Sequence, residues 1–282
     1  MNRTFYFFCL FGFFSVLSLS SCRTEFERVR VSGNTDLIYK KAFEYNEEGD
    51  YLKAQTLFEL LIPAYRGKKE LEQIYFTYAY TYFYEKKFLL AAYYFDNFST
   101  TFSASPLREE AEFMSAYSHY SMSPGYRLDQ TYTKKAIDDF QLFINTFPES
   151  ERVTDANKLI DELRLKLEQK VFAEGDLYFN LTQYQAAILT FENMLKDFPE
   201  TRRSEQVRYL ITKASFLLAE NSIAAKQEER YQIVQKKTLE FLNKYKNSTY
   251  SEEVRSMNEK SLIKIKSFEN ERYQNQSAGS GS

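Results

Sequence analysis

The sequence predicts an all-α protein: a solenoid of about five helical hairpins with a C-terminal capping helix. Helix breakers are scarce, because the 282 residues include only 8 Gly and 5 Pro against 23 Tyr and 26 Phe. Small residues recur at a fixed interval, since Ala42, Ala79 and Ala116 are spaced 37 residues apart. Successive units end in TFSASP, TFPES and DFPET, where a Pro or Ser-rich step stops a helix.

A second motif marks the second helix of each unit by placing Ala four residues before Phe. It occurs as YLKAQTLF at 51–58, FLLAAYYF at 88–95, YTKKAIDDF at 132–140 and YQAAILTF at 184–191. A small side chain beside a large one on one face is what closely packed helix pairs require. This pattern resembles the tetratricopeptide repeat, a pair of antiparallel helices of about 34 residues.

The later units are less regular. Gly175, followed by Tyr178, takes the small position of the fourth unit. A weaker fifth unit spans roughly 202–247, with Ala214 and Leu239 as its markers. A terminal helix from about 251 to 272 is expected to cap the stack, because the last unit of a solenoid would otherwise expose its apolar face.

The third unit carries an insertion. From Ala91 to Ala136 is 45 residues rather than 37, so eight extra residues lie within SMSPGYRLDQT. Insertions in solenoids emerge at one edge, where a partner can reach them. Tyr126, Arg127 and Asp129 combine ring and charge, which is typical of contact surfaces. The alternative is a tolerated surface elaboration.

The N-terminus has the order of a secretory signal: a basic start, an uncharged run from Phe5 to Leu19 and then small residues. The run is short for a membrane span. The sequence LSSC resembles a bacterial lipobox, which implies that Cys22 becomes the lipid-modified first residue of the mature chain. An ordinary signal peptide with an incidental Cys is the alternative. In either case Cys9 would leave with the signal, and the mature chain would form no disulfide.

These boundaries predict four parts of the chain. They are a signal peptide over 1–21, a lipidated linker over 22–34, the solenoid over 35–272, and a flexible tail over 273–282 that resembles a linker scar.

Composition and motifs argue against several functions. The 37 basic and 39 acidic residues are interspersed and leave a net charge of -2, which gives no single-sign field for nucleic acid. His119 is the single histidine and takes the place of Tyr45 and Tyr82 in the earlier units, so a packed imidazole is expected. No phosphate loop or cluster with metal spacing occurs. We therefore expect no catalytic residue, no metal and no cofactor.

Aromatic residues lie at fixed distances before and after the small residue in the first three units. In tetratricopeptide-type repeats the first helix lines the concave face, with positions three before and one or four after the small residue pointing into the groove. Such a ladder suits extended peptides that end in aromatics, although rings at helical spacing can equally pack between units. The groove residues expected on this basis are Tyr39, Phe43, Phe76, Tyr80, Phe83, Phe113, Tyr117 and Tyr120.

The lipobox Cys, the repeats, the stretch YRLDQTYTKKAIDDFQLFINTFPES and the later LLAENSIAAKQEER together resemble the BamD family. These are the lipoproteins of the outer-membrane β-barrel assembly machinery. The resemblance covers nearly the whole mature chain. It implies a non-enzymatic protein that is lipid-anchored on the periplasmic face of the outer membrane. It also implies binding to the BamA-type barrel subunit and other machinery subunits, and receipt of unfolded outer-membrane proteins.

The inserted loop and the fifth-unit turn each join the two helices of a pair, so both are expected at one edge. The turn contributes Asn221, Lys226 and Arg230 to the predicted partner-binding residues. We expect residues 123–246 to hold the BamA-type partner and the N-terminal units to remain free for substrate. Two other classes stay open. One is a pilus or cell-wall-synthesis scaffold of the same repeat type, and the other is a glycan-binding SusD-type lipoprotein, which usually stacks sugars on Trp, whereas this chain has 0 Trp.

Overall fold

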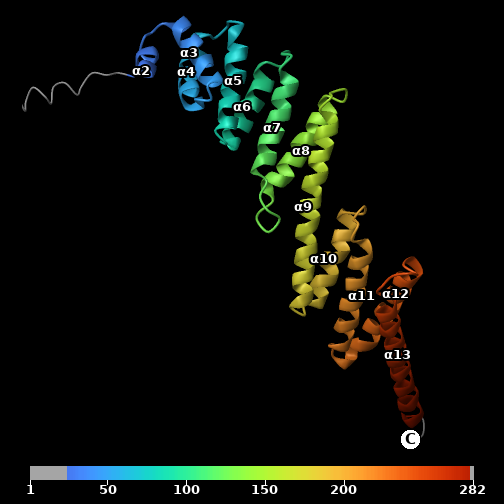
Figure 1. Cartoon of the computed structure of the whole chain (residues 1–282). Coiled ribbons are helices and arrows are strands. Elements are labelled where there is room, and N and C mark those ends of the chain that lie inside the picture. The colour runs from blue at the N-terminus through green and yellow to red at the C-terminus, as the bar shows by residue number, and fades with distance from the viewer. Residues whose placement is uncertain (1–23, 280–282) are drawn as a thin grey trace, which may run out of the picture. The chain divides into compact units, whose positions relative to one another are not determined.

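The computed structural model describes residues 24–279, and within that range it contains helices joined by turns and loops, with no strand (Figure 1). Cys22 and the expected signal peptide lie outside the described residues. The predicted all-α, tetratricopeptide-like fold is confirmed, because consecutive helices pack in pairs. The helices are α2 (Glu25–Arg30), α3 (Thr35–Glu47), α4 (Tyr51–Ala64), α5 (Glu70–Tyr84), α6 (Phe88–Thr101), α7 (Arg108–Met122), α8 (Thr131–Thr146), α9 (Val153–Asn180), α10 (Tyr184–Asp197), α11 (Ser204–Glu220), α12 (Ala224–Lys244) and α13 (Ser251–Gly279).

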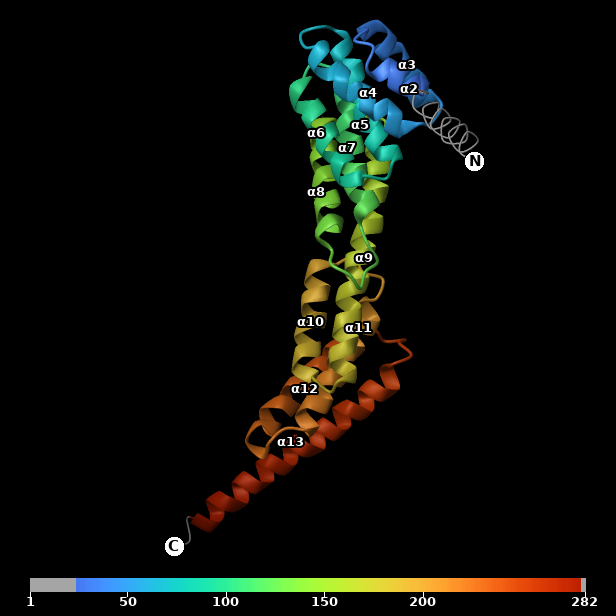
Figure 2. The same ribbon diagram turned by 90° about the vertical axis from the view of Figure 1, so that its left-hand side faces the viewer.

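The described chain forms two compact units. The first holds α2 to α8 and the start of α9, through Ile160. The second begins at Asp161 and holds the rest of α9 with α10 to α13, and it also includes the loop Gly125–Gln130. Within the second unit α9, α10 and α11 lie side by side (Figure 2). Among the described residues no helix is both long and apolar enough to cross a membrane.

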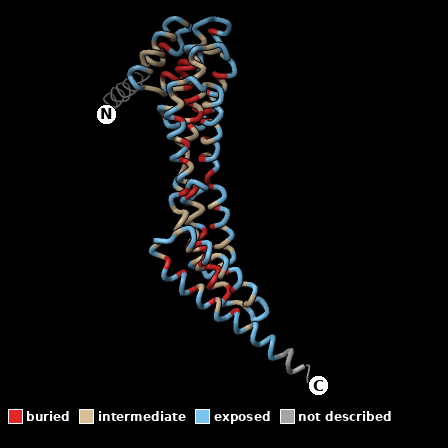
Figure 3. Tube along the Cα trace, turned by 90° about the vertical axis from the view of Figure 1, so that its right-hand side faces the viewer, coloured by how far each residue is buried: buried red, intermediate tan, exposed pale blue. Residues whose placement is uncertain are grey.

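The first four pairs are each held by a small residue of one helix and a ring of the other. The fully buried residues include Ala42, Ala79 and Ala116 of the first helices, and Phe58, Phe95, Phe140 and Phe191 of the second. Around each helix, buried and exposed residues alternate (Figure 3). The fourth pair is closely packed: a Cβ added at Gly175 would lie 2.5 Å from the Phe191 ring. The chain therefore needs Gly at this position for the closeness of two helices, not for an unusual backbone conformation.

The connectors between pairs are fixed by a recurring hydroxyl. Ser150 donates to Glu109 at 2.6 Å and accepts the backbone N–H of Arg152 at 3.1 Å. Thr201 repeats this arrangement one pair later, with Glu168 at 2.7 Å. Each hydroxyl links the first helix of a pair to the connector that leaves its second helix. It also accepts the backbone N–H of the residue directly before the next helix, so it helps to set the direction of the following pair.

The insertion is shared between a loop and two helix ends. The segment 123–130 joins α7 to α8, whereas only 85–87 joins α5 to α6. The loop accounts for five of the eight extra residues, and the others lengthen the end of α7 and the start of α8.

Two details of the C-terminal units differ from the sequence-based expectation. Leu239 is 46% exposed and is not a core marker, while Val234 and Thr238 face the core of α12 with no exposed area. The α12 sequence lacks the Ala–Phe pair that sets the register elsewhere. In addition, α13 continues to Gly279 instead of ending near 272.

We predict that Gly175→Ala destabilises the protein. Ala is favoured over Gly in a helix interior by roughly 1 kcal/mol, but overpacking a core costs about 1–3 kcal/mol, and the Phe191 ring that a Cβ would meet is fully buried. Urea unfolding should show a net loss of about 1 kcal/mol or more. Leu177→Ala is the matched control, because Leu177 is 56% exposed on the same helix. A Gly175→Ala protein more stable than the parent would contradict the close packing.

Candidate binding surfaces

Two of the predicted groove residues belong to the core of the first unit. Phe76 is 9% exposed and packs against Phe98 of α6, with 5.1 Å between ring centroids. Phe113 is 5% exposed and packs against Phe143 of α8 at 5.5 Å. The groove assignment is wrong for these two residues. The position three before the small residue points toward the second helix of its own pair, where a large ring fills the interior.

Tyr80 is half-buried and tied into a polar network. Its ring packs on Phe95 at 4.9 Å, and its hydroxyl donates to Glu110 of α7 at 2.6 Å. Arg152 pairs with the same carboxylate at 2.5 Å and lies over the Phe113 ring at 4.4 Å. Burial raises the pKa of Tyr80, and the hydrogen bond to Glu110 raises it further, so the phenol remains a donor. Tyr80 thus helps to fix α5 against α7.

Three of the predicted residues form a half-buried row across α5 and α7. Phe83 lies 5.9 Å from Tyr117, and Tyr117 stacks on Tyr120 at 5.4 Å with 19° between the ring planes. We call Phe83, Tyr117 and Tyr120 the aromatic row. Each ring keeps part of its surface exposed, so the row offers apolar area to a peptide in addition to packing two helices together.

The rings of α3 are also half-buried. One exposed ring, that of Tyr84, was not among the residues predicted from the sequence. Tyr39 lies 4.8 Å from Phe43, which packs edge-on against Phe58. Tyr84 is 49% exposed and stacks on Tyr51 of α4 at 4.8 Å. Tyr84 falls outside the spacing measured from the small residue. In the sequence, Tyr84 can be identified by its position as the last residue of α5, directly before the turn.

The inserted loop is an ordered part of the second unit. Lys170 of α9 donates to the carbonyl of Leu128 at 2.8 Å, and the side chain of Gln130 donates to that carbonyl at 3.0 Å. The predicted contact residues lie on its surface: Arg127 is exposed and lies over the half-buried Tyr126 ring at 5.5 Å. Asp129 is exposed as well. The loop therefore presents a fixed surface that includes Leu128, which is 62% exposed.

The fifth-unit turn is more self-contained than the sequence suggested. Asn221 is exposed and donates to the carbonyl of Leu217 at 2.8 Å. Arg230 is half-buried and donates to the Ser222 hydroxyl, so its guanidinium holds the turn together. Lys226 is exposed. Of the two predicted cations, only Lys226 projects from this turn.

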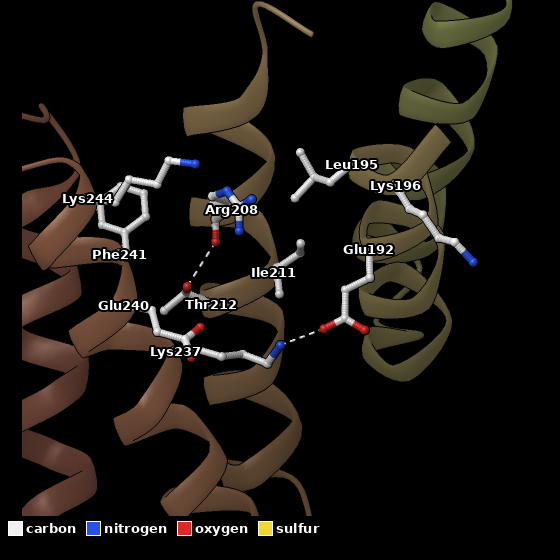
Figure 4. A pocket seen from close by; sticks show the side chains of 10 residues that line it. All are labelled: Glu192, Leu195, Lys196, Arg208, Ile211, Thr212, Lys237, Glu240, Phe241 and Lys244. Atoms are coloured by element: carbon white, nitrogen blue, oxygen red, sulfur yellow. Dashed lines mark hydrogen bonds and ion pairs between the residues drawn. The ribbon is translucent and has the colours of Figure 1, made fainter. Parts of the chain in front are cut away.

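A groove that the sequence did not reveal runs between α10 and α12, with α11 as its floor. One cavity of about 510 Å³ is shown in Figure 4, and an adjoining cavity of about 470 Å³ shares Glu192 and Lys237 with it. These two side chains form an ion pair of 2.6 Å where the cavities meet. The first cavity is lined by Glu192, Leu195, Lys196, Arg208, Ile211, Thr212, Lys237, Glu240, Phe241 and Lys244. Because these residues come from three helices, no linear motif predicts the groove.

Titratable clusters elsewhere are small. His119 lies with Nδ1 2.6 Å from Asp139, which also accepts from Lys135 at 2.6 Å. Burial raises the pKa of Asp139, but hydrogen bonds from His119 and Lys135 outweigh it and leave the pKa below its usual value. In the described part of the chain, no group of three or more His, Cys, Asp or Glu side chains could hold a metal ion.

Two comparisons with known proteins cover most of the repeat region. Residues 32–231 match the family model YfiO, described as outer membrane lipoprotein. Over 210 residues the chain is 22% identical to the outer membrane protein assembly factor BamD of Rickettsia prowazekii (strain Madrid E). That similarity covers 74% of this chain and 84% of the relative. The aromatic row and the inserted loop both fall inside the matched region.

Proposed function

The chain belongs to the YfiO family of outer membrane lipoproteins, and we propose that it is a non-enzymatic component of the β-barrel assembly machinery. The observation that carries this proposal is the family match, because it spans the helical pairs from α3 to the start of α12. The relative that is an outer membrane protein assembly factor supports the same role. In this proposal the first unit receives unfolded outer-membrane proteins, and the second unit holds the BamA-type barrel subunit.

We place substrate binding on the aromatic row. Its rings are partly exposed and are held by contacts between α5 and α7, so little conformational entropy is lost when a peptide packs on them. Contact with rings gives affinity without strict demands on sequence, which suits a protein that handles many unfolded chains. Tyr84 extends the apolar area, since its ring lies 6.1 Å from that of Phe83.

We place partner binding on the second unit, at the inserted loop. Its backbone is held by Lys170 and Gln130, which leaves the side chains of Arg127 and Leu128 available for contact. A fixed loop with an aliphatic tip and charged neighbours has the composition of a docking surface. Tyr126, Asp129, Asn221 and Lys226 are assigned to the same interaction, and Arg230 supports it by holding the fifth-unit turn.

The first prediction for this role concerns substrate capture. Replacing Phe83, Tyr117 and Tyr120 with Ala should weaken binding of a labelled peptide with a C-terminal aromatic residue about tenfold or more, at roughly 0.5–1.5 kcal/mol for each ring contact. Fluorescence anisotropy measures the affinity. Phe76→Ala is the contrasting variant: it should lower the unfolding free energy by about 3–5 kcal/mol, because Phe76 is in the core. Unchanged peptide affinity in the triple variant would rule out the aromatic row.

The second prediction concerns the partner. Affinity purification of the chain from detergent-solubilised membranes should recover a barrel protein with periplasmic repeats, identified by mass spectrometry. The double variant Arg127→Glu with Leu128→Glu should lose most of that recovery while its helical signal stays unchanged, because both side chains are exposed. Lys40→Glu, an exposed charge reversal in the first unit, is the control. If the parent protein recovers no such barrel subunit, the proposed function is wrong.

The third prediction concerns the anchor. We propose that the chain is held on the periplasmic face of the outer membrane through lipid at Cys22, within the sequence LSSC. Cys22→Ser should then remain unprocessed or leave the outer-membrane fraction, since attachment depends on buried acyl chains. Metabolic labelling with a fatty acid should mark the parent and not the variant. Equal labelling of both proteins would exclude Cys22 as the modified residue.

A further inference from the structure

The groove between α10 and α12 holds an arginine without an acceptor. The Nε of Arg208 is buried and has no hydrogen-bond partner among the described residues. Figure 4 shows its guanidinium inside the cavity of about 510 Å³. Buried donors are nearly always paired, because an unpaired one loses its hydrogen bonds to water without replacement. The unpaired Nε of Arg208, beside an open cavity, therefore marks a place for an acceptor.

The lining of this cavity combines cationic and apolar side chains. Lys237 is already paired with Glu192, whereas no interaction joins Lys196, Arg208 or Lys244 to a carboxylate in the described structure (Figure 4). Four cations and two carboxylates line the cavity, which leaves an excess of positive charge. The apolar side chains between them are Leu195, Ile211 and Phe241.

The fold does not require such a groove at this place. Between α4 and α6 the corresponding space is filled: the buried Tyr78 donates to Glu59 of α4 at 3.0 Å and packs on Tyr94 of α6 at 4.9 Å. Between α6 and α8 a cavity of about 360 Å³ is lined by one cation, Arg108, which pairs with Glu112 at 2.8 Å. Unpaired cations at this position are a feature of the α10–α12 groove.

Part of the groove also lies beyond the region that matches the family model. The match ends at residue 231, so the wall formed by Lys237, Phe241 and Lys244 follows it in the chain. The family match therefore does not include this wall of the groove.

We propose that the α10–α12 groove binds an acidic segment of a partner protein, in which carboxylates alternate with apolar residues. Arg208 would take one carboxylate in a forked pair, Lys196 and Lys244 would take its neighbours, and the apolar residues would lie on Ile211 and Phe241. Glu192 and Glu240 among the cations disfavour a dense polyanion and fit spaced carboxylates. This inference rests on the proposed function only in treating the second unit as a docking platform.

The test uses the full mature chain in detergent and a fluorescein-labelled peptide of alternating Glu and Leu, with a Gln–Leu peptide as the neutral match. We expect the Glu peptide to bind about tenfold or more tightly than the Gln peptide, with an affinity that falls as salt is added. Arg208→Gln should reduce binding of the Glu peptide about tenfold. Arg108→Gln is the matched control, because it removes an arginine from the cavity between α6 and α8. It should leave the affinity unchanged.

If Arg208→Gln fails to fold, as judged by its circular dichroism melt, Lys196→Gln with Lys244→Gln replaces it, since both lysines are exposed. Equal binding of the two peptides, or undiminished binding by the variants, overturns the proposal. So does Arg208-dependent binding of phosphatidylglycerol vesicles without peptide binding, which would make the groove a lipid site. Arg208-dependent peptide binding supports the groove even if no barrel subunit co-purifies. Failure to recover a barrel subunit refutes the proposed function but not the groove.

Discussion

The close approach of the two helices in each pair is the constraint on which the rest of this structure depends. Gly175 shows it most directly, because the Phe191 ring occupies the space of its missing side chain. When two antiparallel helices pack this closely, the start of the first lies beside the end of the second. Ser150 and Thr201, in the connectors that follow the second helices, can therefore donate to Glu109 and Glu168 on the first helices. Once the connectors are fixed, each new pair begins in a defined direction. The surfaces available for binding, rows on first helices and grooves between second helices, follow from that geometry.

The two units differ in surface chemistry because different side chains occupy equivalent positions of the repeat. In the first unit, Tyr78 and its neighbours close the space between α4 and α6, and the partly exposed rings of the aromatic row lie across α5 and α7. In the second unit the corresponding space is an open cationic groove. One scaffold thereby offers two surfaces of different chemistry, one apolar and one charged. Under the proposed function, the apolar surface would serve unfolded chains and the charged surface a partner protein.

The sequence predicted the hairpins well because Ala and Phe at fixed spacing report directly on helix packing. The insertion before α8 was visible for the same reason, as a break in that spacing. The orientation of rings was harder to predict: Phe76 and Tyr80 are both aromatic, yet a ring of either kind can face the core or the solvent at the rim of a helix. The role of Arg208 could not be predicted from the sequence. Whether its Nε has a partner depends on side chains from three helices, which no single segment encodes.

The central claim is that this chain assists the folding of outer-membrane barrels, and its depletion in the living cell tests that claim most directly. When synthesis of the protein is stopped, the account predicts that folded barrel proteins in the outer membrane fall and unfolded forms accumulate in the periplasm. Lipoproteins that do not depend on barrel assembly should stay constant. Undiminished levels of folded barrels after the protein has disappeared would contradict the account.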